Sequence, residues 1–223
     1  MSFTQLFELY PECEYIKALS KNFHIMDEIY KECGNTFLEG CGSYLFNGQV
    51  YEYYEGMYDK QQLLYHTAKK YSSILEIGVY MGHSLFIMLL GNPTLKITCI
   101  DIDDTYSVPA IRVLQKHFPE CIIKFIKGDS KETLLPVEGK FDLFHIDGSH
   151  TTNYVYREFL ICFEKLMKKD VCFVFDDYDV YSDIVDDLST HSTDLYSPKS
   201  YRIALCEWRN AIIEFSYVPG CVK

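Results

Sequence analysis

Two acidic segments of this chain carry the residue types that acid–base or metal-assisted chemistry needs. One apolar run ends at Asp147, with His150 three residues later, and a second run, Val171 to Phe175, ends in Asp176 and Asp177. Parallel strands deliver such ends to one edge of a sheet, where three carboxylates repel each other unless a cation neutralises them. Oxygen ligands favour Mg²⁺, with Mn²⁺ or Ca²⁺ as alternatives. We therefore predict a metal site at these three aspartates, the alternative being that they only cap helices.

The histidines near these acids differ in what they can do. An ordinary imidazole has a pKa of about 6.5, so His150 beside Asp147 can accept a proton at neutral pH. We predict these two residues as the catalytic pair; the alternative for His150 is a helix-start residue bonded to the backbone. His145 lies inside the apolar run and is expected to be a satisfied core residue, and no role is predicted for His83.

A glycine-containing segment earlier in the chain has the character of a ligand-binding loop. Gly78 and Gly82 are spaced G-x-x-x-G, with Glu76 before them and Ser84 after them. Neither the dinucleotide pattern G-x-G-x-x-G nor the P-loop G-K-[ST] is present, which argues against those nucleotide sites. Glu76 would repel a pyrophosphate but suits a cationic amino-acid group, and Asp101, after the next apolar run, is placed to bind both hydroxyls of a ribose. The alternative is a structural glycine-rich turn.

The elements that position these residues alternate between apolar strands and amphipathic helices from residue 72 onward. This alternation predicts an α/β fold, a doubly wound, seven-stranded and mostly parallel sheet closed by an antiparallel pair. The expected strands are 74–77, 96–100, 121–126, 141–146, 171–175, 202–206 and 212–217. The expected helices are 83–90, one starting near Ser107, 152–167 and 181–188.

Residues 1–66 are expected to form an N-terminal helical extension that acts as a lid, and residues 67–223 the main domain. Tyrosines crowd the end of the extension, and their rings and hydroxyls would suit a sugar. The candidate lid tyrosines are Tyr44, Tyr51, Tyr53, Tyr54 and Tyr58. The loop Ser189 to Ser200 is expected to form the opposite wall.

The composition of the chain limits the classes of partner and the cellular compartment that we expect. The formal net charge is −11 and no basic stripe is visible, which argues against a duplex nucleic acid as partner. The longest apolar run, Leu85 to Leu90, is too short to span a bilayer, and the N-terminus lacks a signal-peptide pattern. Nine cysteines without a C-x-x-C pair argue against zinc and favour a reducing cytoplasm. Homo-oligomerisation stays open.

The glycine loop and two later acids together resemble a known family. Glu76-x-Gly78-x-x-x-Gly82-x-Ser84, Asp101 and Gly128-Asp129-Ser130 resemble the class I S-adenosylmethionine-dependent methyltransferases over roughly residues 60 to 217. The resemblance implies that the loop lies along the methionine part of the cofactor, that Asp101 binds the ribose and that Asp129 lies beside the adenine. The cofactor-binding residues it implies are Glu76, Gly78, Gly82, Ser84, Asp101 and Asp129.

The acidic segments carry a second, narrower resemblance. Asp147-Gly148-x-His150 with Asp176-Asp177 resembles the metal-dependent sugar O-methyltransferases, including those acting on macrolide sugars, and the wider group of the misnamed cephalosporin hydroxylases. It implies that the three acids hold Mg²⁺ and that His150 is the base. Catechol-type enzymes have Asn as the last ligand, a pattern from which Asp177 departs.

The expected function is therefore a Mg²⁺-assisted O-methyltransferase that acts on a small hydroxylated acceptor. A sugar is the first choice of acceptor, and a phenol or another small hydroxylated molecule remains open. A metal-independent methyltransferase and a non-catalytic S-adenosylmethionine-binding module are the alternatives.

Overall fold

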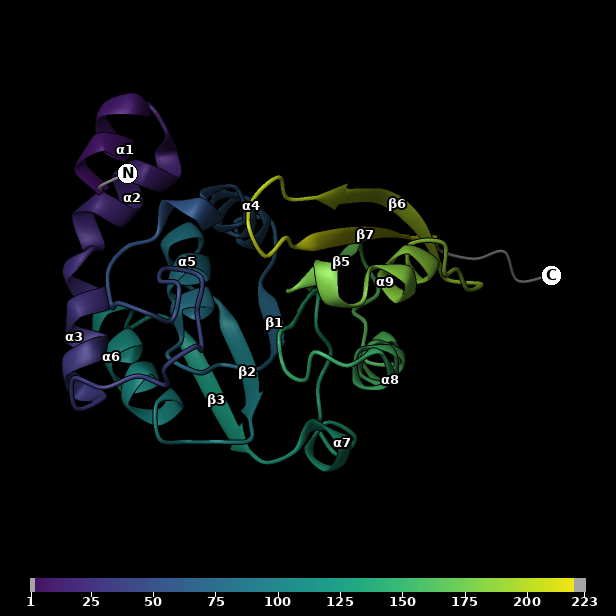
Figure 1. Ribbon diagram of the computed structural model, residues 1–223. Coiled ribbons are helices and arrows are strands. Elements are labelled where there is room, and N and C mark those ends of the chain that lie inside the picture. Colours follow the sequence, from purple (N-terminus) through teal and green to yellow (C-terminus); the bar gives the residue numbers. More distant parts are fainter. Residues whose placement is uncertain (1–2, 219–223) are drawn as a thin grey trace.

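The computed structural model describes residues 3–218, in which a seven-stranded sheet lies between two helical layers (Figure 1). The strand order is β3-β2-β1-β4-β5-β7-β6. The parallel strands are β1 (Ser73–Ile77), β2 (Lys96–Asp101), β3 (Ile122–Lys127), β4 (Leu143–Ile146) and β5 (Val171–Phe175). The strands β6 (Tyr196–Ile203) and β7 (Ala211–Tyr217) pair antiparallel beyond β5. The predicted doubly wound sheet with an antiparallel closing pair is confirmed.

Helices cover both faces of the sheet, because successive strand residues point to opposite sides. Ile74 faces one hydrophobic core and Leu75 the other. The first face is covered by α2 (Glu14–Asn22), α3 (His24–Glu32), α4 (Tyr58–Ala68), α5 (His83–Gly91) and α6 (Ser107–His117). The second is covered mainly by α8 (Thr152–Phe163) and α9 (Ser182–Leu188). The remaining short helices are α1 (Phe3–Leu9), η1 (Glu55–Met57), α7 (Ser130–Thr133) and η2 (Tyr178–Val180).

The expected helical extension is present, and it packs against the sheet. Buried side chains of α2, α3 and α4 belong to the same hydrophobic cluster as Ile74 and Ile97 of the sheet. In Figure 1, α2 and α3 lie along the left side of the molecule beside α5 and α6, and α4 lies at the top next to α5. The extension therefore shares a core with the strands, and the boundary at residue 66 stays a prediction.

Two of the expected elements differ by more than two residues from the sequence-based expectation. The strand expected at 202–206 is the edge strand β6, which starts at Tyr196. Its polar sequence and Pro198, a residue that edge strands tolerate, hide it from a pattern search. The helix expected to reach residue 167 ends at Phe163, because the chain turns there and Leu166 bridges to Phe141.

Within residues 3–218, every helix is too short or too polar to cross a membrane. The cysteines in this part of the chain are all free thiols, and Cys221 lies outside the described residues.

Candidate active site

A cavity of about 720 Å³ lies at the carboxyl ends of β1, β2, β4 and β5. Its size suits a small-molecule cofactor and a modest acceptor. The predicted site residues that line it are Gly78, Ser84, Asp101, Asp129, Asp147, His150, Asp176 and Asp177. Glu76 and Gly82 are not in its lining. The fold thus brings most of the predicted residues to one place, from segments up to about a hundred positions apart.

Gly78 joins the cofactor-type loop to the acidic end of the site. Its φ is +87°, and a Cβ built on it would lie 1.9 Å from the carbonyl oxygen of Asp147. The backbone N–H of Asp147 donates to the carbonyl of Ile77 at 2.8 Å. Only glycine allows the two backbone segments to pass so closely, so the loop fixes the position of Asp147. Gly82, by contrast, begins α5 and faces Ala110 and Leu114.

Asp101, the last residue of β2, shapes the same loop. Its Oδ2 accepts the backbone N–H groups of Val79 and Tyr80, each at 2.8 Å, and its Oδ1 accepts that of Asp103 at 3.0 Å. An ionised carboxylate offers about four lone-pair positions, so Oδ1 retains room for a ligand hydroxyl. This fits the predicted ribose-binding role.

Asp129 and Ser130 lie where the chain leaves β3. Asp129 caps α7 by accepting the N–H of Lys131 at 2.9 Å, and Ser130 donates to Oε1 of Glu158 at 2.5 Å. Glu158 is 2% exposed, and its Oε2 has no partner among the described residues. Burial raises the pKa of Glu158 to about 7, although the Ser130 hydroxyl opposes this shift. Sequence inspection missed this residue, because it lies on α8 at an ordinary helical position.

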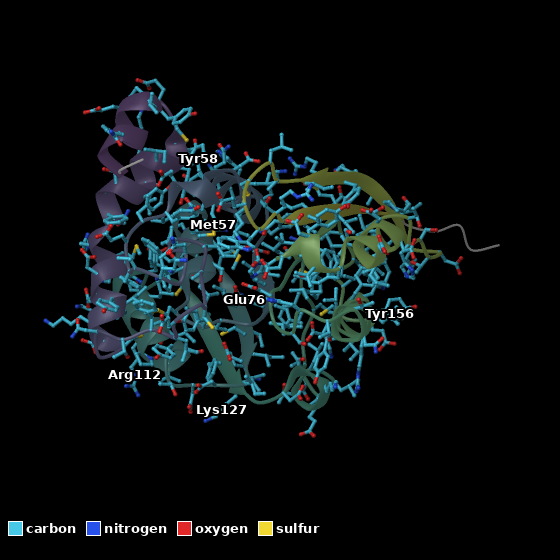
Figure 2. All side chains as sticks on the ribbon, in the orientation of Figure 1. Met57, Tyr58, Glu76, Arg112, Lys127 and Tyr156 are labelled. Carbon is cyan, nitrogen blue, oxygen red and sulfur yellow. The ribbon has the colours of Figure 1, made fainter. Side chains whose placement is uncertain are left out.

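Glu76 is fully buried near the centre of the molecule (Figure 2). Its Oε1 accepts the hydroxyl of Ser84 at 2.6 Å and lies 2.8 Å from Nδ1 of His145. The other ring nitrogen of His145 lies 2.7 Å from the hydroxyl of Tyr44, which also accepts from Asn210 at 2.5 Å. His145 is thus the satisfied core residue that was predicted. Oε2 of Glu76 is buried without a described partner, and it is an acceptor suited to a cationic group above the loop.

The predicted acids converge, and a lysine lies among them. Nζ of Lys60 is 2.9 Å from Oδ1 of Asp176, and their side chains are 3% and 9% exposed. The imidazole of His150 lies between the other two acids, with Nδ1 3.1 Å from Asp177 and Nε2 3.6 Å from Asp147. The positive charge that three carboxylates require is therefore supplied in part by the protein. Lys60 was missed because it lies on α4, with no motif spacing to mark it.

The proximity of these groups changes their proton affinities. Burial and the neighbouring Asp176 raise the pKa of Asp147 to about 7. Asp147 and then Asp177 raise the pKa of His150 to about 9, against the effect of its partial burial. Burial opposes ionisation of Asp176 too, but the adjacent Lys60 holds the pKa of that carboxyl below its usual range. The two flanking carboxylates therefore favour the imidazolium form of His150.

The three acids do not fit a divalent ion in the arrangement described. Asp176 is paired with Lys60, and the other two acids face His150. Across residues 3–218, no three His, Cys, Asp or Glu side chains are placed to hold a metal ion.

The residues that line the cavity differ from the walls that the sequence predicted. Of the five candidate lid tyrosines, only Tyr44 lines the cavity. Tyr51, for example, donates to the carbonyl of Met26 and contacts His83. Residues of the segment 38–47 line the cavity instead. This segment is tied to the glycine loop because the N–H of Leu38 donates to the Tyr80 hydroxyl at 2.8 Å. The loop 189–200 does not line the cavity, and Trp208 of the β6–β7 turn does so instead.

The comparisons with known proteins agree with the fold. Residues 75–178 match the model of a family described as a methyltransferase domain. No curated protein sequence matches the chain significantly.

Three solved structures illustrate the range of the fold. The methyltransferase PaMTH1 of Podospora anserina, with S-adenosylhomocysteine bound, is 14% identical (TM-score 0.60) over 87% of this chain and 88% of its own. The O-methyltransferase TomG of Streptomyces achromogenes, involved in tomaymycin synthesis and solved with S-adenosylmethionine, is 15% identical (TM-score 0.56) over 71% and 79%. A candidate RNA methyltransferase of Pyrococcus horikoshii is 13% identical (TM-score 0.52) over 89% and 98%. At such identities the likeness shows the fold alone.

Proposed function

We propose, on the premise that residues 75–178 form an S-adenosylmethionine-dependent methyltransferase domain, that this chain methylates a hydroxyl oxygen of a small acceptor. The observation that carries the proposal is the contact between Gly78 and Asp147. It joins a loop suited to the cofactor to a carboxylate–imidazole pair suited to removing a hydroxyl proton. Both reaction partners would then lie in one cavity, and holding them together supplies much of the rate.

In this proposal the cofactor end of the cavity is organised by the glycine loop, by Asp101 and by Asp129. Gly78 and Ser84 would border the methionine part, with Glu76 beneath them and Gly82 allowing the turn into α5. Asp101 would bind the ribose, and the adenine would lie beside Asp129. When bound, S-adenosylmethionine supplies an electrophilic methyl group on a sulfonium.

At the acceptor end, we assign proton removal to Asp147 and His150 as a pair. His150 begins as the imidazolium, held by Asp147 and Asp177, and this cation orients the Asp147 carboxylate. The pKa of Asp147 is raised to about 7, close to neutral pH, which suits a general base. Asp147 and His150 would take up the hydroxyl proton, so that the acceptor oxygen could receive the methyl group that the bound cofactor would supply.

The acceptor is proposed to be a small hydroxylated molecule, with a sugar as the first choice and a phenol as the second. Tyr44, Met57 and Trp208 provide apolar and aromatic surface at this end, which suits either class. The net charge of −11 argues against a nucleic acid. A cytoplasmic location also belongs to the proposal.

The reaction has two forms that differ in their need for metal. The magnesium-assisted form rests on the convergence of Asp147, Asp176 and Asp177. The metal-independent form is favoured by the buried ion pair between Lys60 and Asp176, which already neutralises one of these acids. We therefore propose the metal-independent form, and loss of turnover after chelation, restored by Mg²⁺, would support the other one.

The experiment incubates the chain with S-adenosylmethionine labelled in the methyl group and separate pools of sugars, glycosides and phenols. We expect S-adenosylhomocysteine and a labelled methyl ether in at least one pool. An Asp147→Asn variant is the control that keeps the side-chain volume. Tight cofactor binding with no labelled product in any pool would favour a non-catalytic binding module.

A further inference from the structure

We infer that Lys60 is a built-in cation of the acceptor site, taking the charge role for which a divalent metal ion was predicted. The inference rests on the proposed function in placing the acceptor beside Asp147 and His150. Lys60 comes from α4 of the N-terminal extension and belongs to none of the recognised motifs.

Burial makes the position of Lys60 informative. Lysine is almost never fully buried unless it is paired, because desolvating an ammonium group is costly. Here the residue is 3% exposed, and its Nζ lies 2.9 Å from Asp176 and 4.6 Å from the ring centre of Tyr44. The carboxylate and the aromatic ring together stabilise the charge. Asp176 and Tyr44 therefore hold the ammonium group in its buried position within the site.

Lys60 is directed at the chemistry of the site. It lines the same cavity as Asp147, Asp177 and His150. An ammonium group has three N–H donors, and the hydrogen bond to Asp176 uses one of them. A remaining donor can contact the acceptor oxygen as its proton leaves and stabilise the negative charge that develops there. A metal ion would stabilise the negative charge on the same oxygen in the same way.

The surrounding contacts leave little place for a second cation. Asp176 is occupied by Lys60, while Asp147 and Asp177 both face the ring nitrogens of His150. A divalent ion would have to displace both partners and would meet the repulsion of the buried ammonium. Removing the lysine charge should therefore convert the acidic cluster into a metal site.

The test measures Mn²⁺ binding to the whole chain by electron paramagnetic resonance of the free ion and by thermal stabilisation, neither of which needs an acceptor. Lys60→Met keeps an unbranched side chain that is one atom shorter, and it removes the charge. Lys70→Met is the matched control, because Lys70 is exposed and pairs only with Glu214 among the described residues. We expect the Lys60→Met variant to bind Mn²⁺ at least roughly tenfold more tightly than the wild type and the control.

Two further variants complete the test. Lys60→Arg keeps the charge and should bind Mn²⁺ as weakly as the wild type, whether or not the Met variant folds. Adding Asp176→Asn to Lys60→Met should abolish the gained site. Equal Mn²⁺ affinity in the wild type and Lys60→Met, or tight binding by Lys60→Arg, would overturn the inference. Failure of methyl transfer would instead affect the proposed function and leave these binding results unchanged.

Discussion

Replacing Gly78 by alanine should damage both the stability of the chain and its cofactor site. The φ of +87° disfavours any residue with a Cβ, at a cost of roughly 1–2 kcal/mol. The added Cβ would also lie 1.9 Å from the oxygen and 2.5 Å from the carbon of the Asp147 carbonyl. These are backbone atoms, so relief requires the loop and the end of β4 to separate, at a further cost of about 1–3 kcal/mol.

The expected loss of roughly 2–5 kcal/mol corresponds to a fall in melting temperature of roughly 5–15 °C for a chain of this size. Gly82→Ala is the matched control. Its φ of +67° imposes a similar strain, but its nearest neighbours are the side chains of Ala110 and Leu114 at 3.3 and 3.4 Å. The control should therefore lose only about 1–2 kcal/mol.

The assay combines thermal unfolding with calorimetric titration of S-adenosylhomocysteine. Gly78→Ala should weaken this ligand by at least roughly tenfold, because the loop moves away from Asp147. Gly82→Ala should retain most of the affinity. If Gly78→Ala proved as stable as the control and bound the ligand equally well, the reasoning about the close passage at Asp147 would be refuted.

Three further predictions concern single residues. Because the pKa of Glu158 is raised to about 7, charging it destabilises the fold as pH rises from about 4.5 through 7, so the stability of Glu158→Gln relative to wild type should increase by up to about 3 kcal/mol between pH 5 and 8. Melting curves at the two pH values test this, and a pH-independent difference would contradict it. Asp101→Ala should weaken the binding of S-adenosylhomocysteine by at least roughly tenfold in calorimetry, since two loop N–H groups lose their acceptor. The control Asp104→Ala, at a half-exposed residue that pairs with Lys127, should keep the affinity. His150→Ala should slow methyl transfer by roughly 10²-fold with unchanged cofactor affinity, and a near-native rate would assign proton removal to Asp147 alone.

The sequence predicted the buried parts of this fold well, because their patterns are local. Val171–Phe175 is apolar throughout and forms β5 with the expected bounds, as a strand covered on both faces should. The edge strand β6 was partly missed, since it has one solvated side and contains Pro198. Its extent depends on pairing with β7, which no local pattern records.

The candidate site also contains residues that the sequence predicted and residues that it did not. Asp147, Asp176 and Asp177 were found because acids that end neighbouring parallel strands must meet at one edge. Lys60 was not found, because its partner Asp176 is 116 positions away and the contact follows from how α4 packs against the sheet. The extra cation in turn changes the proton affinities of the neighbouring acids, so the chemistry of the site depends on tertiary packing as well as on its motifs.

A crystal of the chain soaked with S-adenosylhomocysteine and Mg²⁺ tests the proposed site most directly. We expect the amino-acid part of the ligand to lie along Gly78, its ribose to contact Asp101, and its sulfur to face Asp147 and His150. We also expect Lys60 to stay on Asp176, with no metal ion between the acids. A ligand bound outside this cavity, or one whose sulfur points away from Asp147, would contradict the proposed site.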